Sequence, residues 1–247
     1  MFITLLTVAL TTLFDSQHGT ALAAIVTPEE LVIAADSRVV NSADQPLDDT
    51  CKIRIVHGTI ITGHGMAESQ DTGYDLFALA ATAARQAASV QEVATALARA
   101  APQPVAAALA ALRAGQPDAF ERKAADSTPG VILARWEGER PALGYVRFVL
   151  KRAGHTLAVQ PVVHLCPGQD CPHGVAGVFA APGLADTQEF QLRHPHYAPG
   201  NLVDTARRFV QAQIDRRWPS VGPPIDIIRL KRGTAAWVQR QVSCPPA

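Results

Sequence analysis

Two neighbouring apolar segments near the amino terminus constrain the fold of this chain more than any other sequence feature. Residues 21–26 and 31–36 each have the composition of a buried strand, and the polar residues 27–30 between them predict a tight turn. Strands joined by so short a connection pair antiparallel. A second hairpin is predicted over residues 52–62, where His57 and Gly58 separate two further apolar runs.

Helical periodicity follows these hairpins. The alanine-rich stretch from Ser69 to Leu112 predicts two or three helices, and another helix is predicted from Asn201 to about Arg217. Further strands are predicted at 131–136, 143–150, 156–163, 175–179, 225–230 and 235–242. Because hairpins make antiparallel neighbours and each helical run follows a set of strands, we expect an α+β fold, a four-layer α-β-β-α sandwich with two antiparallel sheets between helical layers.

Composition limits the classes of partner. With 247 residues and 48% hydrophobic content, the chain can bury one large core, and no linker divides it into two domains. Its 22 basic and 22 acidic side chains cancel, so no charged surface calls for a nucleic acid or an anionic lipid. Neutral peptides and small molecules remain as candidate substrates.

The first fourteen residues form an apolar run that is too short to span a bilayer and is similar to the core of a secretory signal. No basic residue precedes the run. The sequence Ala-Leu-Ala at 21–23 also fits a signal-peptidase site, and cleavage after Ala23 would remove Thr20. We expect residues 1–19 to be a leader or propeptide of a domain spanning 20–247, with an exported or periplasmic location slightly favoured over a cytoplasmic one.

Four cysteines allow two disulfides. Cys166 and Cys171 flank a turn sequence, which favours a disulfide, although unpaired thiols or a metal site with His164 and His173 are alternatives. Cys51 and Cys244 have no candidate partner except each other. We predict no metal and no cofactor.

The most informative residues are spaced along the first hairpins. Gly19 precedes Thr20, and Asp36, Arg38 and Lys52 follow Thr20 by sixteen, eighteen and thirty-two residues, before the sequence Gly63-His-Gly65. These spacings resemble those of a proteasome β-subunit, an N-terminal-nucleophile (Ntn) hydrolase. The resemblance covers the first 70 residues well and the remainder in outline. It implies a chain that is cut between Gly19 and Thr20, hydrolyses peptides and forms a homo-oligomeric ring.

The resemblance gives each of these residues a chemical role. Thr20 would be the nucleophile, and its free α-amine, with a pKa near about 8, would be the base. The Lys52 ammonium would favour the alkoxide, Asp36 would orient Lys52, and Arg38 would fix the cluster by a second ion pair. Backbone donors must stabilise the oxyanion, and Gly65 is the candidate.

The second half of the chain matches the family less well. Asp215 and Ser220 resemble an Asp and a Ser that complete the family's active site, but their separation is two residues longer than in the family. Residues 179–183 offer no hydroxyl where the family has a serine. For His64, a role in a wall of the site or in specificity is favoured over one as an acid or base.

These observations favour a threonine-type amide hydrolase, an endopeptidase, that acts on a peptide or amide substrate. Two alternatives remain. One is a catalytically inactive scaffold subunit, which the missing hydroxyl favours, and the other is an exported binding domain that is cleaved after Ala23. None of the three has a nucleic acid partner or a stable membrane span.

Overall fold

The structure is a computed structural model that describes residues 16–17, 20–40, 45–48, 50–117, 120, 129–153, 156–169, 171, 174–181 and 201–247. Its strands are β1 (Ser16–Gln17), β2 (Leu22–Val26), β3 (Glu30–Asp36), β4 (Val39–Val40), β5 (Pro46–Leu47), β6 (Ile53–Val56), β7 (Thr59–His64), β8 (Glu68–Ser69), β9 (Tyr74–Asp75), β10 (Gly130–Glu137), β11 (Arg140–Ala153), β12 (Thr156–Cys166), β13 (Ala176–Ala180), β14 (Ile225–Lys231) and β15 (Thr234–Gln239). Its helices are η1 (Gln70–Thr72), α1 (Leu76–Gln86), α2 (Val90–Ala100), α3 (Pro102–Gly115) and α6 (Leu202–Asp215).

Two five-stranded antiparallel sheets form the body of the molecule. Sheet 1 has the strand order β13-β2-β3-β14-β15, and sheet 2 has the order β12-β11-β10-β7-β6. Both hairpins predicted from the sequence are confirmed, because β2 pairs with β3 in sheet 1 and β6 pairs with β7 in sheet 2. The helix predicted from Asn201 is also confirmed as α6, with Asn201 at its N-cap.

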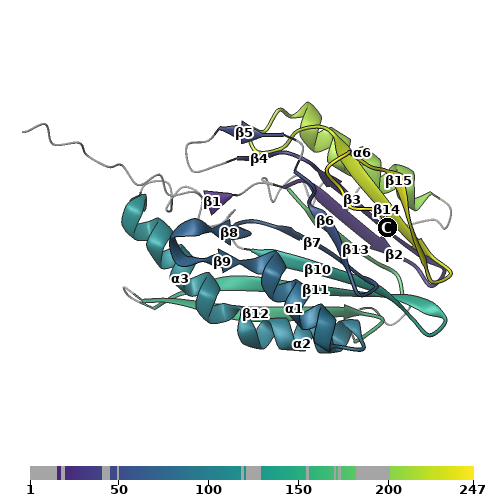
Figure 1. The fold of residues 1–247 in the computed structure, drawn as a ribbon, viewed down its shortest axis with the longest axis horizontal. Helices are drawn as coiled ribbons and strands as arrows, with labels where there is room; N and C mark the ends of the chain where they lie inside the picture. The colour runs from purple at the N-terminus through teal and green to yellow at the C-terminus, as the bar shows by residue number, and fades with distance from the viewer. Residues whose placement is uncertain are drawn as a thin grey trace, which may run out of the picture.

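The core lies in three layers of side chains. One cluster fills the space between the two sheets, a second lies between sheet 2 and helices α1 to α3, and a third lies between sheet 1 and α6. Figure 1 shows α1 to α3 on one side of the molecule and α6 on the other. Strand β3 contributes to both faces of sheet 1, since Ile33 and Ala35 face sheet 2 while Val32 and Ala34 face α6. Burial on both faces explains why β3 is apolar throughout instead of alternating.

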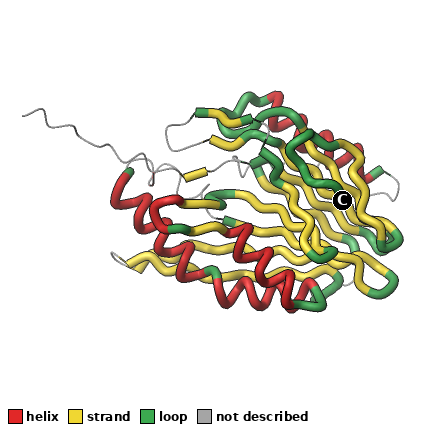
Figure 2. Tube along the Cα trace, in the orientation of Figure 1, coloured by secondary structure: helices red, strands yellow, loops and turns green. Residues whose placement is uncertain are grey.

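The predicted four-layer α-β-β-α sandwich is corrected by the structure. Of the residues that the structure describes, 43% lie in strands, and the same part of the chain has four α-helices. Three helices cover the outer face of sheet 2, whereas α6 is the one described helix on sheet 1, and two small sheets, β1-β8-β9 and β4-β5, lie outside the large ones (Figure 2). Sequence periodicity identifies hairpins and helices, but it does not show how many helices cover each face. Within the described residues, the helices are too short or too polar to cross a membrane.

Candidate active site

Thr20, Asp36 and Lys52 lie at one end of the two sheets. Thr20 comes just before β2, and Asp36 ends β3, which runs antiparallel to β2 with Leu22 opposite Ala35. Lys52 comes directly before β6 of sheet 2. All three residues are buried, with exposed fractions of 7%, 0% and 4%. The two hairpins therefore bring together residues from two sheets.

The Asp36 carboxylate is the centre of this cluster. Its Oδ1 atom accepts a hydrogen bond of 2.7 Å from Lys52 Nζ and another of 2.8 Å from the backbone nitrogen of Ala21. The Lys52 ammonium and the peptide that directly follows Thr20 thus share one oxygen atom. Lys52 Nζ and Ala21 N can be no further apart than these two hydrogen bonds laid end to end, so the lysine lies close to the Thr20 backbone.

Backbone donors hold the other carboxylate oxygen. Asp36 Oδ2 accepts hydrogen bonds from the backbone nitrogens of Arg38, at 3.2 Å, and Gly222, at 3.1 Å. The backbone of Asp36 also donates to the carbonyl of Ala21 at 3.0 Å. A buried carboxylate with this many donors has its position fixed. Gly222 was not identified from the sequence, because its contact with Asp36 joins residues 186 positions apart.

The electrostatics of the pair suit proton transfer. Burial raises the pKa of Asp36 and lowers the pKa of Lys52, while the ion pair between them opposes both shifts. A lysine whose pKa is lowered gives up its proton more readily than an exposed lysine, which favours a role in proton transfer.

Arg38 does not form the expected second ion pair in this cluster, which corrects that prediction. Its Nε and Nη2 atoms donate to the Asp48 carboxylate at 2.6 and 3.1 Å. This hydrogen bond raises the pKa of Arg38. Both side chains are partly exposed, at 25% and 46%. Arg38 hydrogen-bonds to Asp36 through its backbone N–H, while its side chain pairs with Asp48, the residue after β5.

Asp215 and Ser220, two other residues predicted for the site, differ in their exposure and in their distance along the chain from Gly222. Asp215 is exposed at the end of α6, where its carboxylate accepts a hydrogen bond from Gln211 Nε2 at 2.8 Å, so it is outside the buried cluster. Ser220 is partly buried and precedes by two residues the Gly222 that contacts Asp36. The segment after α6 thus reaches the site through a backbone group.

Gly65 lies directly after β7, on the same end of sheet 2 as Lys52, since Ile53 pairs with Thr62. It is buried and has a φ of 77°, a left-handed conformation that favours glycine. Its assignment as an oxyanion donor stays a prediction.

His64 is held by a neighbour in sheet 2. Its Nε2 atom is 2.8 Å from the Tyr145 hydroxyl, and the Tyr145 ring stacks on His164 at 6.3 Å between ring centroids. Gly130 lies opposite His64 in the sheet, and its missing side chain leaves room for this contact. The three rings therefore form a row across four strands of sheet 2, with Gly130 of β10 in the space between His64 and Tyr145.

Replacing Gly130 with alanine should separate His64 from Tyr145. The new Cβ would lie 2.9 Å from both His64 Cε1 and Tyr145 Cε2 and would also meet His64 Nε2. We expect a loss of about 1–3 kcal/mol in the free energy of unfolding, measured by urea denaturation. In a His64→Ala background the same substitution should cost much less, and an equal cost in both backgrounds would contradict this explanation.

His64 should also make stability depend on pH. Burial, with a smaller contribution from Arg147, lowers the pKa of His64 to about 4 from 6.5. Between these values the unfolded chain binds more protons than the folded one, so stability is fully present above about pH 6.5 and falls as the pH drops toward 4. With a discount for the partial exposure of His64, the loss is about 2 kcal/mol.

Urea titrations at pH 7 and pH 4.5 measure this loss. His64→Gln should reduce the difference between the two pH values, whereas His57→Asn, in the exposed β6–β7 turn, should leave it unchanged. If His64→Gln retains the full difference, the effect belongs to other groups.

Both possible disulfides are present. The predicted Cys166–Cys171 bond is confirmed, and Cys51 is bonded to Cys244, 193 residues away. The alternative of a metal site at Cys166 and Cys171 involves His173, which lies outside the described residues, and both thiols are used in the disulfide.

Comparisons with known proteins give a structural likeness but no match in sequence. No family model matches the chain, and no curated protein matches it in sequence. Among solved structures, a Gly-1 mutant of Anbu from Hyphomicrobium sp. strain MC1 is similar over 90% of this chain and 86% of that chain, with 17% sequence identity and a TM-score of 0.54. At this identity the likeness shows the fold alone.

The resemblance to a proteasome β-subunit is corrected by these findings. The solved structure described above is that of an Anbu mutant, and no family model joins the chain to the β-subunits. A few residues at fixed offsets on two hairpins can predict a fold. They do not distinguish between protein families that share that fold. The chain shares its overall fold with this Anbu structure.

Proposed function

We propose that this chain is a threonine-type amide hydrolase that matures by cleavage of the Gly19–Thr20 bond and acts on peptides. One observation carries the proposal: Lys52 Nζ and the backbone nitrogen that follows Thr20 donate to the same oxygen of the fully buried Asp36. A base with a lowered pKa is thereby held beside a hydroxyl residue at the beginning of a central strand.

The first reaction is the cleavage of the chain itself. Before cleavage the nitrogen of Thr20 is an amide and cannot act as a base, so the neutral amine form of Lys52, which burial favours, takes the hydroxyl proton and becomes the ammonium. Thr20 Oγ bonds to the carbonyl carbon of Gly19, the C–N bond breaks, and the proton passes to the leaving nitrogen. Water then hydrolyses the ester, which releases the leader and leaves a free α-amine on Thr20.

The mature site would repeat this chemistry on a substrate. The α-amine of Thr20 takes the hydroxyl proton, directly or through a water molecule, and returns it to the leaving amine. The Lys52 ammonium, fixed by Asp36, stabilises the alkoxide, and the backbone N–H of Gly65 is our candidate for the oxyanion donor. No metal or cofactor enters these steps.

The leader supports a peptide as the substrate. Strand β1 pairs antiparallel with β8, with Ser16 opposite Ser69 and Gln17 opposite Glu68. A segment just upstream of Thr20 is thus bound as an added strand, which is a common mode of peptide recognition. A substrate peptide could use the same strand edge after the leader has left.

The position of β2 argues against cleavage after Ala23. Leu22 and Ala23 are fully buried within β2, where Ala23 pairs with Ala34 on one side and Phe179 on the other. Cleavage there would remove two residues from a central strand, whereas cleavage before Thr20 leaves the strand intact. The exported binding domain is therefore the weaker alternative.

An inactive scaffold subunit remains the second candidate. Ala180 and Ala181 carry no hydroxyl at the end of β13, and Pro182 and Gly183 lie outside the described residues. The homo-oligomeric ring also stays a prediction, which size-exclusion chromatography with light scattering would check.

Labelling with a peptide epoxyketone separates the hydrolase from the scaffold. This reagent bonds to both the hydroxyl and the free α-amine of an amino-terminal threonine, so it reports the two groups together. We expect one molecule of label per mature chain, located on Thr20 by peptide mass mapping. A folded chain that begins at Thr20 but takes up no label would favour the scaffold.

A further inference from the structure

Asp226, on β14, is fully buried and accepts a hydrogen bond from Ser37, the residue that follows Asp36. The Ser37 hydroxyl donates to Asp226 Oδ2 at 3.1 Å. The backbone of Ser37 donates to the Gly222 carbonyl at 3.2 Å and accepts from the Thr50 nitrogen at 3.0 Å. Ser37 therefore joins the end of β3 to the segment after α6 and to the segment that leads to Lys52.

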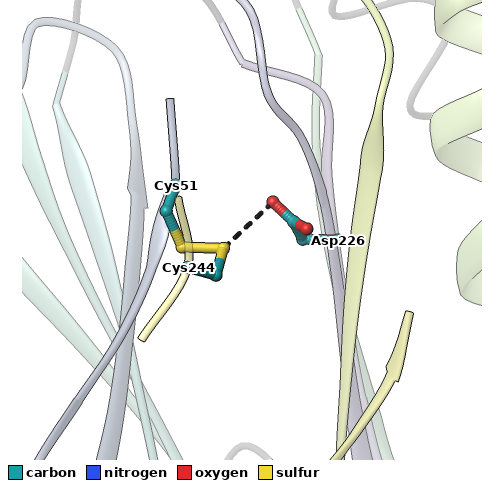
Figure 3. Close-up of side chains that lie close together, drawn as sticks. All are labelled: Cys51, Asp226 and Cys244. Atoms are coloured by element: carbon teal, nitrogen blue, oxygen red, sulfur yellow. Dashed lines mark hydrogen bonds between the residues drawn. A yellow bond between two sulfur atoms is a disulfide. The ribbon is translucent and has the colours of Figure 1, made fainter. Parts of the chain in front are cut away.

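The carboxyl-terminal segment returns to the same carboxylate. The backbone nitrogen of Gln241 donates to Asp226 Oδ1 at 2.8 Å, and its side-chain amide donates to Oδ2 at 2.9 Å. Cys244 Sγ lies 3.3 Å from Oδ2 (Figure 3). A disulfide sulfur has no proton to donate, so this last approach is a contact rather than a hydrogen bond.

The Cys51–Cys244 disulfide crosses between the two sheets beside the ion pair. Cys244 follows β15 of sheet 1, and Cys51 is the residue before Lys52, which leads into β6 of sheet 2. The Lys52–Asp36 ion pair also joins sheet 2 to sheet 1. Because Cys51 and Lys52 are adjacent in the chain, the disulfide and the ion pair connect sheet 2 to sheet 1 at the same place.

We propose that Asp226, Gln241 and the Cys51–Cys244 disulfide form a C-terminal clamp that positions Lys52 against Asp36, so that reduction of this disulfide slows the reaction of Thr20. The proposal rests on the proposed function for its effect on Thr20. None of the clamp residues touches the reacting atoms, so they are positioning residues. A shift of about 1 Å in a catalytic group can cost about a hundredfold in rate, so loss of the clamp should have a measurable effect.

The second disulfide offers a matched control. Cys166–Cys171 closes a loop at the end of β12, and it bonds neither to the Lys52 segment nor to Asp226. A dithiol reductant supplies two electrons and two protons, converts a disulfide into two thiols and is itself oxidised to a cyclic disulfide. Chelator is kept in every buffer, because the side-chain donor atoms of Cys51, Asp226 and Cys244 lie within 4.8 Å of one another and their reduced form could bind a metal ion.

The first test measures epoxyketone labelling of Thr20 in the oxidised and reduced mature protein. Reduction of the wild type should lower the maximal labelling rate about tenfold or more and leave the concentration for half-maximal rate unchanged, because position and not reagent binding is lost. The double variant Cys51→Ser/Cys244→Ser should show the lowered maximal labelling rate both with and without reductant. Cys166→Ser/Cys171→Ser should keep the wild-type rate and remain sensitive to reductant, and Asp226→Asn should lower the rate while its disulfide is intact.

The second test does not depend on Thr20. Brief acetylation of the Thr20→Ala chain, followed by mass mapping, reports how accessible the Lys52 amine is. Loss of the Cys51–Cys244 bond should raise acetylation of Lys52 relative to exposed lysines, at temperatures where the chain stays folded. Unchanged Lys52 acetylation and unchanged labelling would overturn the clamp. Raised acetylation with no labelling even in the oxidised wild type would support the clamp and refute the proposed function.

Discussion

The Thr20→Ala chain is expected to keep its leader and to lose amide hydrolysis by at least about a thousandfold, because it has no hydroxyl to form the acyl intermediate. Thr20 is nearly buried, so the alanine leaves a small cavity and the fold should persist. Intact mass, together with the rate of hydrolysis of a fluorogenic peptide, measures both effects.

Thr20→Ser is the matched control for this prediction. Serine keeps the hydroxyl and lacks only the methyl group, so we expect a processed chain with part of the wild-type rate. If Thr20→Ala is processed and hydrolyses the peptide as fast as the wild type, another residue is the nucleophile.

Lys52→Met should damage both activity and stability. Activity should fall by about 10² to 10⁴, the usual contribution of a positioned acid or base. The free energy of unfolding should fall by about 3–5 kcal/mol, because Asp36 would keep a buried charge without the ammonium that pairs with it. Peptide hydrolysis and urea denaturation at pH 7 measure the two effects.

Two variants control for this interpretation. Lys231→Met removes a partly exposed lysine at the opposite end of sheet 1, where it lies 3.7 Å from Glu30, and should cost at most about 1 kcal/mol without affecting activity. Adding Asp36→Asn to Lys52→Met should restore part of the stability but none of the activity. If the double variant is no more stable than Lys52→Met alone, the unpaired charge is not the cause.

The sequence predicted the parts of the fold that are local. The turn at His57 and Gly58 joins paired strands, and Asn201 begins a helix, because both signals lie within a few residues of the structure they specify. The resemblance to a proteasome β-subunit implied the contact between Asp36 and Lys52, and the structure shows it at the ends of the two hairpins. The layers were less predictable, since the number of helices on each sheet depends on contacts between distant segments.

The remainder of the site depends on contacts that sequence spacing does not reveal. Gly222 and Asp226 reach Asp36 and Ser37 from nearly two hundred residues away. Arg38 was expected to pair inside the cluster, but the exposed Asp48 lies ten residues ahead and offers a carboxylate in a solvated position. A guanidinium pairs there at a smaller cost of burial than in the fully buried cluster, which sequence offsets cannot show.

The amino terminus of the purified protein tests the central claim most directly. Intact mass and amino-terminal sequencing of protein expressed with residues 1–247 should show a chain that begins at Thr20, and a Lys52→Met chain should remain unprocessed. A mature chain that begins at Ala24, or a wild-type chain that still begins at Met1, would contradict the assignment of Thr20 as the nucleophile.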